Sequence, residues 1–436
     1  MKFYDRQKEL ALLKEIEKQS QDIAQMTFMV GRRRIGKTRL LLHAYKESTY
    51  LYFFVARKNE ALLIEEFVEE VKRKLNIPIY GEIKSFAQLF DLLMHTSKTR
   101  HFTLIIDEFQ EFETINRSVF SDMQRIWDLN KDDSKLNLIM CGSIYSMMQR
   151  IFENSKEPLF GRATRRIHLK AFDIDTVKEI MEDYLPEYSN DDLLAFYMLT
   201  GGVAKYIESL AMVRAFTFDS IVDFVFEENS IFLSEGKNVL IEEFGKDYTN
   251  YFSILSLIAS GKTSRVEIES IMEIQTGGFL ERLESEYGLI SRVRPLFSKP
   301  NSRSVKFRID DNFLRFWFRF IYKYRSAVEA SNMEFMKQMV RRDYSVYSGR
   351  VLEQYFTEKL MLEQRYNLIG SYWERNNMNE IDIVAVDDLN KKILIAEVKR
   401  NPDNISIGLL KDKAKNIVSK FKDYSFEFVG LSIEDM

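Results

Sequence analysis

The sequence predicts an α/β protein, in which a parallel β-sheet domain comes first and helical and mixed α/β modules follow it. In residues 1–170, apolar runs of strand length alternate with amphipathic helical patterns, as in sheets whose parallel strands are joined by helices. The chain has 436 residues, 45% of them apolar and 30% charged, with 17 Gly and 6 Pro. This composition is typical of a globular chain without low-complexity segments. At about 100–200 residues per domain, the length allows several domains.

The scarcity of cysteine and histidine excludes whole classes of chemistry. The sequence contains 1 Cys and 4 His, and the last histidine is His168. One thiol cannot form an intramolecular disulfide, and zinc sites need several Cys or His ligands at fixed spacing. Any chemistry after residue 168 must therefore use carboxylates, lysines, hydroxyls and metal ions that prefer oxygen ligands.

Charge and hydropathy limit the partners that the sequence predicts. The net charge is -3, so a surface that attracts nucleic acid has to be local. No apolar run is long enough to span a bilayer, and no secretory leader is recognisable. The sequence therefore predicts a cytoplasmic protein without a membrane partner.

The predicted elements follow from hydrophobic periodicity. The strands expected in the first domain are Thr27–Val30, Tyr50–Val55, Thr103–Ile106, Leu136–Cys141 and Arg166–Leu169. Residues 173–243 have helical periodicity. Three short helices and two strands are expected over residues 250–307, then a long aromatic helix from Asp311. From about Ser345 the pattern predicts helix, strand, strand and helix.

A phosphate-binding loop is predicted directly after the first strand. Residues 31–38 fit the pattern G-x-x-x-x-G-K-[ST] and lie between a strand and a helix, as this motif requires. Backbone N–H groups of such a loop bind phosphates, the lysine reaches the β- and γ-phosphates, and the Thr38 hydroxyl is a Mg²⁺ ligand. The flanking elements favour this interpretation over a chance basic turn. The predicted nucleotide contacts are Gly31, Arg32, Arg33, Arg34, Ile35, Gly36, Lys37, Thr38 and Arg39.

Two acidic residues end the strand Thr103–Ile106. Asp107 and Glu108 follow an apolar run, so they are expected at the edge of the sheet where parallel strands carry ligands. We expect Asp107 to hold Mg²⁺ through water and Glu108 to act as the general base for an attacking water. An acidic pair after a strand is also common in surface turns, but the phosphate loop favours the catalytic interpretation. The glutamate further indicates hydrolysis, since binding alone does not need it.

The strand that ends at Cys141 is followed by Gly142 and Ser143. Ser143 either orients the attacking water near the γ-phosphate or caps the next helix. The sequence does not choose between these two roles. Cys141 lies within the apolar run and is expected in the core.

Several segments together resemble the archaeal-type ATPases, P-loop proteins of the AAA+/STAND superfamily that are related to origin-recognition ATPases. The segments are residues 3–10, 31–41, 105–108, 141–143, 160–162 and 200–203. The resemblance implies an ATPase that needs ATP and Mg²⁺, with Arg6 and Glu9 in the segment that closes over the adenine and ribose. It also implies a helical lid whose second sensor region contains Gly201 and Gly202. Ala204 stands where such families often carry proline, and this departure weighs against a direct phosphate contact from the lid.

An arginine that senses the γ-phosphate is expected shortly before the last strand of the sheet. Arg162 is the preferred residue, acting in cis or from a neighbouring subunit. Arg165 and Arg166 are the alternatives, and an arginine at a sheet edge is often simply solvated.

The three short helices and two strands after residue 250 are in the order of a winged helix. Between residues 288 and 309 there are six basic residues and no acidic residue, namely Arg292, Arg294, Lys299, Arg303, Lys306 and Arg308. Such a stripe predicts contacts to DNA phosphates. The preceding helix carries Glu281, Glu284 and Glu286, which disfavours sequence reading. The alternative is a winged helix used only for packing. The aromatic residues 313–321 are expected in the core rather than as a base-stacking platform.

The C-terminal module carries carboxylates and a lysine on paired strands. Glu380 and Asp382 share one face of a strand, and Glu397 and Lys399 share one face of the next. Antiparallel pairing brings Asp382 near Glu397, where the two can hold a divalent cation, and Lys399 can stabilise the transition state. Glu353 on the preceding helix can complete the cluster. This order of residues resembles the PD-(D/E)XK nucleases, although members of that group can lose catalysis.

The sequence therefore predicts four segments: a P-loop ATPase domain (1–170), a helical lid (171–245), a winged helix (246–325) and a nuclease-like domain (326–436). The predicted function is an ATPase that couples its nucleotide state to DNA binding or Mg²⁺-dependent DNA cleavage. The alternative is a STAND-like switch that binds a protein partner and has a non-catalytic nuclease-like domain. No oligomeric state is predicted.

Overall fold

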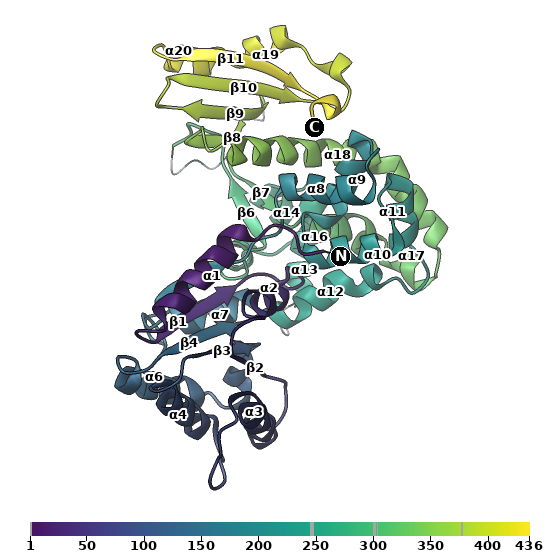
Figure 1. The fold of residues 1–436 in the computed structure, drawn as a ribbon. Coiled ribbons are helices and arrows are strands. Elements are labelled where there is room, and N and C mark those ends of the chain that lie inside the picture. The colour runs from purple at the N-terminus through teal and green to yellow at the C-terminus, as the bar shows by residue number, and fades with distance from the viewer. Residues whose placement is uncertain (1, 245–247, 300–301, 303, 376–377) are drawn as a thin grey trace. The chain divides into compact units, whose positions relative to one another are not determined.

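The computed structural model describes residues 2–244, 248–299, 302, 304–375 and 378–436. The chain divides into two compact units (Figure 1). One unit is Tyr4–Ala171, and the other is Phe172–Met436 together with the N-terminal residues up to Phe3. The predicted segments 171–245, 246–325 and 326–436 all lie in the second unit.

The unit Tyr4–Ala171 is built on a parallel sheet. Its strands are β1 (Gln25–Val30), β2 (Tyr50–Phe54), β3 (Phe102–Asp107), β4 (Leu136–Cys141) and β5 (Arg165–His168). They lie in the order β2-β3-β4-β1-β5, and every neighbouring pair is parallel. The predicted α/β class with a parallel sheet is confirmed, and each strand lies within two residues of its predicted bounds.

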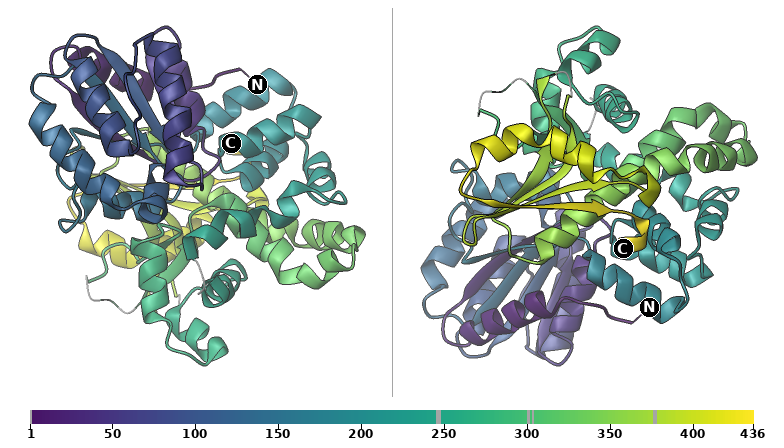
Figure 2. Two further views of the ribbon diagram at one scale, coloured as in Figure 1. Left: turned by 90° about the horizontal axis from the view of Figure 1, so that it is seen from below. Right: turned by 90° about the horizontal axis from the view of Figure 1, so that it is seen from above.

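Helices join and cover these strands on both faces of the sheet (Figure 2). They are α1 (Gln7–Gln19), α2 (Lys37–Ala44), α3 (Glu60–Leu75), α4 (Phe86–Ser97), α5 (Phe112–Ile115), α6 (Ser118–Asn130) and α7 (Tyr145–Glu153). Strands β1, β3 and β4 are buried along their whole length, as expected for a sheet with helices on both sides. The order of strands places the carboxyl end of β4 between those of β1 and β3, so residues that follow these three strands meet at one edge.

The second unit begins with five helices, where the periodicity predicts a helical segment. They are α8 (Ile174–Tyr184), α9 (Asn190–Thr200), α10 (Ala204–Val213), α11 (Phe218–Val225) and α12 (Ile231–Phe244). Asp173 caps α8, and Ser189 caps α9 in a reciprocal capping box with Asp192. These caps satisfy N–H groups that a helix end leaves without partners, so each helix starts at a defined residue.

Three further helices and a two-stranded antiparallel sheet follow. They are α13 (Tyr248–Ala259), α14 (Arg265–Met272), α15 (Gly277–Ser285), β6 (Ile290–Val293) and β7 (Lys306–Ile309). This is the order of elements that the winged-helix prediction requires.

The prediction of one long aromatic helix from Asp311 is wrong, because the segment is divided into several short helices and turns. A short helix, α16 (Asn312–Phe316), is followed by a π-helical turn (Trp317–Ile321), a 3₁₀ turn (Tyr322–Tyr324) and α17 (Arg325–Glu329). The rings of this segment are buried, as predicted, and Trp317 and Phe318 both pack edge-on against Phe252. The need to bury rings on several sides overrides the regular helical period.

The C-terminal part contains a mixed sheet of four strands in the order β11-β10-β9-β8. The strands are β8 (Leu368–Tyr372), β9 (Ile381–Asp387), β10 (Lys392–Val398) and β11 (Ser425–Leu431). The long helix α18 (Met333–Leu362) contacts β8, β9 and β10, and α19 (Ile407–Lys413) and α20 (Lys415–Lys420) pack on the sheet (Figure 1). The sequence predicted β9 and β10 but missed the more exposed β8 and β11, in which hydrophobic alternation is weak.

None of the helices in the described part of the chain combines the length and apolar character needed to cross a membrane.

Gly202 lies at a crowded point after α9, and we expect Gly202→Ala to destabilise the protein. Its φ is 76°, and an added Cβ would lie 2.0 Å from the carbonyl oxygen of Phe172. Gly261 is a matched control, because its φ is 95° but the nearest atom to an added Cβ lies at 3.5 Å. Gly261→Ala should cost about 1–2 kcal/mol of backbone strain, and Gly202→Ala should cost more. Apparent Tm values measure this difference, and equal values would contradict it.

Candidate functional site

The phosphate loop lies between β1 and α2 in a conformation that requires glycine. Gly36 has φ 98°, and Arg34 is also left-handed with φ 72°. A Cβ on Gly31 would lie 2.7 Å from the carbonyl oxygen of Leu169. Both glycines of the motif therefore have a physical role, one through its left-handed backbone and one through close packing. Ile35 is buried beneath the loop, whereas Arg34 and Arg39 are exposed and Arg32 and Arg33 are half-buried.

The Lys37 amine is held inside this loop. Its Nζ donates hydrogen bonds to the carbonyl oxygens of Gly31 at 2.6 Å and Arg32 at 3.1 Å, and the residue is 8% exposed. Burial lowers the pKa of Lys37. An anionic phosphate in the loop opposes that effect, because it stabilises the protonated amine. Ligand charge and lysine charge are thus coupled at this position.

Asp107, at the end of β3, connects the loop to two neighbouring strands. Its Oδ2 accepts hydrogen bonds from the hydroxyls of Thr38 at 2.7 Å and Tyr52 at 2.8 Å. Its Oδ1 accepts from the Glu108 N–H at 3.0 Å and from the Cys141 thiol at 3.1 Å. A hydroxyl and a carboxylate in contact at a phosphate loop are oxygen ligands that suit Mg²⁺, so the residues fit the predicted ion.

Glu108 is oriented by polar contacts from the ends of β3 and β4. It has a left-handed backbone, with φ 55°, and its Oε2 accepts hydrogen bonds from Ser143 at 2.7 Å and Gln110 at 2.5 Å. Arg33 in turn donates from Nε to the Ser143 hydroxyl at 3.3 Å. These contacts hold the carboxylate at the same edge as the phosphate loop, which is where a general base for water is needed.

The structure does not support the helix-capping role predicted for Ser143. The cap position of α7 is occupied by Ile144, which makes no side-chain cap, whereas the Ser143 hydroxyl contacts Glu108. The bond to Glu108 supports the interpretation as a water-orienting residue.

Sequence reasoning missed two residues of this site and placed a third only in the core. Tyr52 on β2 contacts Asp107, and Gln110 contacts Glu108. A Cβ on Gly142 would lie 2.1 Å from Oε1 of Gln110, so the glycine leaves room for the amide. Cys141 is buried as predicted, and burial raises its thiol pKa, so it is a hydrogen-bond donor to Asp107 rather than a nucleophile. The only signal in the sequence that could have indicated Tyr52 as a site residue is its alternation with Tyr50 along the strand.

The two predicted adenine-side residues contact each other. Arg6 is 5% exposed, donates from Nη2 to the carbonyl oxygen of Lys170 at 2.8 Å, and lies 3.5 Å from Glu9. With φ 75°, Arg6 begins α1 in a left-handed conformation. These contacts attach the start of α1 to the end of the sheet domain.

Arg162 lies at the opposite edge of the sheet from the phosphate loop. Its guanidinium forms an ion pair with Asp128 at 2.9 Å, beside the segment 23–25 that leads into β1. The loop follows the other end of the same strand. Sensing of the phosphate in cis by Arg162 is therefore not supported by this geometry, because the strand separates the two positions. Arg166 forms an ion pair with Glu153, and Arg165 is exposed.

The C-terminal carboxylates meet around Lys399 as the strand pairing predicted. In the antiparallel register Ala396 pairs with Ile383, so Glu397 and Asp382 are the next residues along. The Nζ of Lys399 lies 3.1 Å from Asp382 and 3.1 Å from Glu397. Lys413 on α19, which sequence reasoning missed, also contacts Glu397, at 2.9 Å.

Electrostatics tie Glu353 of α18 to this cluster. Burial and the nearby Asp382 carboxylate raise the pKa of Glu353 to about 7. Burial also raises the pKa of Asp382, whereas burial of Glu397 is outweighed by Lys413 and Lys399, which lower its pKa. Among the described residues, no three His, Cys, Asp or Glu side chains are grouped closely enough to hold a metal ion. The predicted pair of metal ligands, Asp382 and Glu397, is bridged by the Lys399 ammonium in this arrangement.

The predicted DNA-binding residues are only partly on one surface. Lys306 and Arg308 of β7 line a cavity together with Asp382, Glu397 and Lys399. Lys306 forms an ion pair with Glu380 at 2.8 Å, and Arg292 forms one with Glu284 at 2.8 Å. Arg294 and Lys299 are exposed. Arg303 lies outside the described residues.

Comparison with known proteins identifies the first half of the chain. Residues 3–210 match the model of an ATPase domain predominantly from Archaea. The predicted resemblance to archaeal-type ATPases is confirmed over these residues. Residues 317–425 match a model of archaeal and bacterial proteins of unknown function. The loop, Asp107 and Glu108 all lie within this matched ATPase domain, and the chain is an ATP hydrolase.

Individual proteins are similar to this chain in sequence or in fold. The chain is 28% identical over 406 residues to an uncharacterized protein of Methanocaldococcus jannaschii, covering 91% of this chain and 87% of that protein. A Walker-type ATPase of Pyrococcus abyssi has a similar fold, with a TM-score of 0.56, 17% identity and coverage of 72% of this chain and 96% of that one. The Aeropyrum pernix ORC2 protein has a TM-score of 0.50 and 15% identity, covering 76% and 95%.

Two substitutions in the nucleotide site should separate binding from hydrolysis. Lys37→Ala should abolish ATP binding, because it removes the buried cation of the loop. Glu108→Gln should retain bound ATP but lower kcat by about 100-fold or more, because the amide cannot accept the proton of water. Glu65→Gln on the exposed face of α3 is the matched control. Equilibrium binding and steady-state phosphate release measure both effects, and equal turnover in Glu108→Gln and the unmodified protein would contradict the role of Glu108.

Proposed function

We propose that the ATPase couples its nucleotide state to DNA binding or Mg²⁺-dependent DNA cleavage by the second unit. The observation that carries this proposal is a cavity whose wall combines basic residues of β7 with the carboxylate and lysine cluster. Lys306 and Arg308 supply positive charge, and Asp382, Glu397 and Lys399 supply the hydrolytic groups. Phosphate contacts beside metal-ligating carboxylates are what cleavage of a phosphodiester requires.

The cluster has a suitable donor set for the ion. Asp382 and Glu397 are oxygen ligands on neighbouring strands, and Mg²⁺ is bound by one or two carboxylates that leave water in its other positions. Displacement of Lys399 from between them frees both carboxylates for the ion. When bound, the ion supplies charge stabilisation for the transferring phosphate, and Lys399 remains close enough to donate to the same phosphate.

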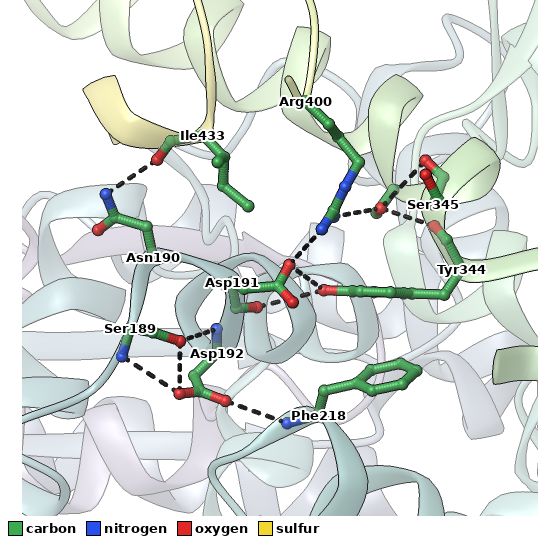
Figure 3. A network of polar contacts seen from close by, with 10 residues as sticks. Ser189, Asn190, Asp191, Asp192, Phe218, Tyr344, Ser345, Arg400 and Ile433 are labelled. Atoms are coloured by element: carbon green, nitrogen blue, oxygen red, sulfur yellow. Dashed lines mark hydrogen bonds and ion pairs between the residues drawn. The ribbon is translucent and has the colours of Figure 1, made fainter. Parts of the chain in front are cut away.

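A mechanical route from the ATPase domain to this cluster runs through α9. At one end of the helix, the N–H of Phe172, the first residue after the ATPase unit, donates to the carbonyl oxygen of Gly202 at 2.9 Å. At the other end, Asp191 accepts a hydrogen bond from Arg400 at 2.7 Å (Figure 3). Arg400 follows Lys399 directly in the chain. A displacement of the chain at residue 171 is thus transmitted by a single rigid helix to the residue beside Lys399.

Further contacts make the Arg400 connection rigid. Asp191 also accepts a hydrogen bond from the Tyr344 hydroxyl at 2.8 Å (Figure 3). Arg400 donates to the Ser348 hydroxyl at 2.7 Å. The guanidinium lies over the Tyr344 ring, 4.8 Å from its centroid. A second contact runs from Asn190 to the carbonyl oxygen of Ile433 at 2.9 Å (Figure 3). The start of α9 therefore holds both the end of β10 and the C-terminal turn.

A second candidate function is a STAND-like switch that binds a protein partner and does not cleave DNA. The bridging position of Lys399 and the additional Lys413–Glu397 ion pair favour it, because two ammonium groups at the carboxylates compete with a metal ion.

Reversal of the charges on the basic wing tests DNA binding. Replacing Arg292, Arg294 and Lys306 with Glu should weaken DNA affinity by about tenfold or more and reduce its dependence on salt. The reversal of Lys72, Arg73 and Lys74 on α3 is the control with the same change in net charge. Titrations in the ATP-retaining Glu108→Gln protein and in Lys37→Ala also test the coupling. If all of these variants bind DNA with the same affinity and salt does not change that affinity, the result would favour the protein-binding switch.

Cleavage is tested at Lys399. In Mg²⁺ or Mn²⁺, Lys399→Ala should lower DNA strand cleavage by about 100-fold or more, because the transition-state charge loses its ammonium partner. Lys392→Ala, at the exposed start of the same strand, should cleave like the unmodified protein. Cleavage that survives Lys399→Ala would place the nuclease outside this cluster, and no cleavage by the unmodified protein would support the switch.

A further inference from the structure

The cavity beside the carboxylate cluster extends well beyond the residues used above. It has a volume of about 690 Å³ and is lined by β7, α16 with the π-helical turn, α18 and the C-terminal sheet, all within the second unit. This size is in the range of sites for small ligands, about 300–1,000 Å³. Apart from Glu353, the part of the wall formed by α16 and α18 has no role in the proposed cleavage chemistry.

One face of α18 forms a polar row along this cavity. Tyr347, Arg350, Glu353 and Gln354 all line it, and their spacing of three or four residues places them on the same side of the helix. The row leads from Tyr347 to Glu353, the residue electrostatically coupled to Asp382. At 1.5 Å per residue, the row from Tyr347 to Glu353 is about 9 Å long.

Two buried groups at the far end of this row have no hydrogen-bond partner among the described residues. They are Nε of Arg315 and the hydroxyl of Tyr347. Tyr347 is 8% exposed, and burial raises its pKa to about 12 although the neighbouring Arg315 guanidinium lowers it, so its hydroxyl keeps a proton to donate at neutral pH. Arg315 is held in place, because its Nη2 donates to Asn312 and Gln354 at 2.7 Å each. Buried donors without acceptors are costly, so this end of the cavity is suited to a ligand rich in acceptor oxygens.

Arginine side chains in the cavity wall favour an anion, although Asp343, Glu353, Glu380, Asp382 and Glu397 line the same cavity. Arg308, Arg319 and Arg350 also line the cavity, and Arg319 is neutralised by an ion pair with Asp343 at 2.6 Å. Guanidinium groups match the geometry of phosphate oxygens. A carboxylate-bearing peptide would bring its charge close to Asp382, Glu397 and Glu353, whereas a nucleic-acid strand can place one phosphate at the arginines and another at the lysine.

We propose that Arg315, Tyr347 and Arg350 form a subsite for a phosphate of a single nucleic-acid strand that enters the cavity and reaches the Lys399 cluster. This proposal rests on the proposed function and narrows its substrate to a strand end or an unpaired segment. A cavity of about 690 Å³ is too small to enclose a double helix. The phosphate is either terminal or internal to the strand, and the experiment distinguishes the two.

Binding of labelled oligonucleotides in EDTA, where no metal-dependent cleavage occurs, tests the subsite. The probes are one single-stranded DNA with a 5′-phosphate, the same strand with a 5′-hydroxyl, and a blunt duplex of that strand. Arg350→Gln and Tyr347→Phe should each weaken single-strand binding by about tenfold. Arg350→Gln should also lower the slope of log Kd against log salt by about one. Arg325→Gln on α17 is the control, since it removes an exposed arginine that does not line the cavity.

The outcomes separate this proposal from the proposed function. A loss confined to the 5′-phosphorylated strand identifies a terminal phosphate, and an equal loss for both strands identifies an internal one. If Arg350→Gln and Tyr347→Phe lose the same affinity in a Lys399→Ala background, the subsite proposal stands even when no DNA is cleaved and the nuclease proposal fails. Equal affinities of Arg350→Gln, Tyr347→Phe and Arg325→Gln for the single strand, or tighter binding of the blunt duplex than of the single strand, would overturn the subsite.

Discussion

The carboxylate of Asp107 is the interaction on which the nucleotide site depends. It receives the Thr38 hydroxyl from the start of α2, the Tyr52 hydroxyl from β2, and the Cys141 thiol from β4. Because β4 lies between β1 and β3, these bonds join the ends of three parallel strands and the phosphate loop into one rigid edge. The position of Glu108 follows, since it is the next residue and is fixed by Ser143 from β4. A general base can act on water only when it is held in this way beside the phosphate.

In the second unit, the carboxylate cluster depends on Lys399 as the nucleotide site depends on Asp107. It compensates two carboxylates that antiparallel pairing brings together, and buried carboxylates of like charge do not remain ionised beside each other without such a cation. Burial lowers the pKa of Lys399, but the nearby Asp382 and Glu397 carboxylates have a larger opposite effect, so the net shift of its pKa is upward. The ammonium group therefore stays charged, and a metal ion must compete with it. The Lys399 ammonium that stabilises the paired strands must therefore be displaced before Asp382 and Glu397 can bind a metal ion.

Parts of the fold could be predicted because they depend on local patterns. The strands β1, β3 and β4 are continuous apolar runs, and a parallel sheet buries such runs on both faces. The phosphate loop combines glycines, lysine and threonine at a spacing that only a strand–loop–helix can use. The aromatic segment after Asp311 could not be predicted in detail, because its rings pack in several directions and replace a regular helix by π and 3₁₀ turns. Strands β8 and β11 were missed since their burial depends on partners distant in the sequence.

The sequence by itself determined the chemistry of the nucleotide site: Lys37, Thr38, Asp107 and Glu108 are specified by motifs whose function needs those side chains at those positions. Only the tertiary structure decided which groups surround them. Tyr52 and Gln110 reach the nucleotide site from separate elements, and Lys413 reaches Glu397 from α19. Arg162 precedes β5, so it lies at the edge of the sheet opposite the phosphate loop. The row from Tyr347 to Glu353 likewise becomes a cavity wall only when α16 and β7 pack beside α18. Contacts between distant segments follow from packing and loop closure, and no local pattern in the chain encodes them.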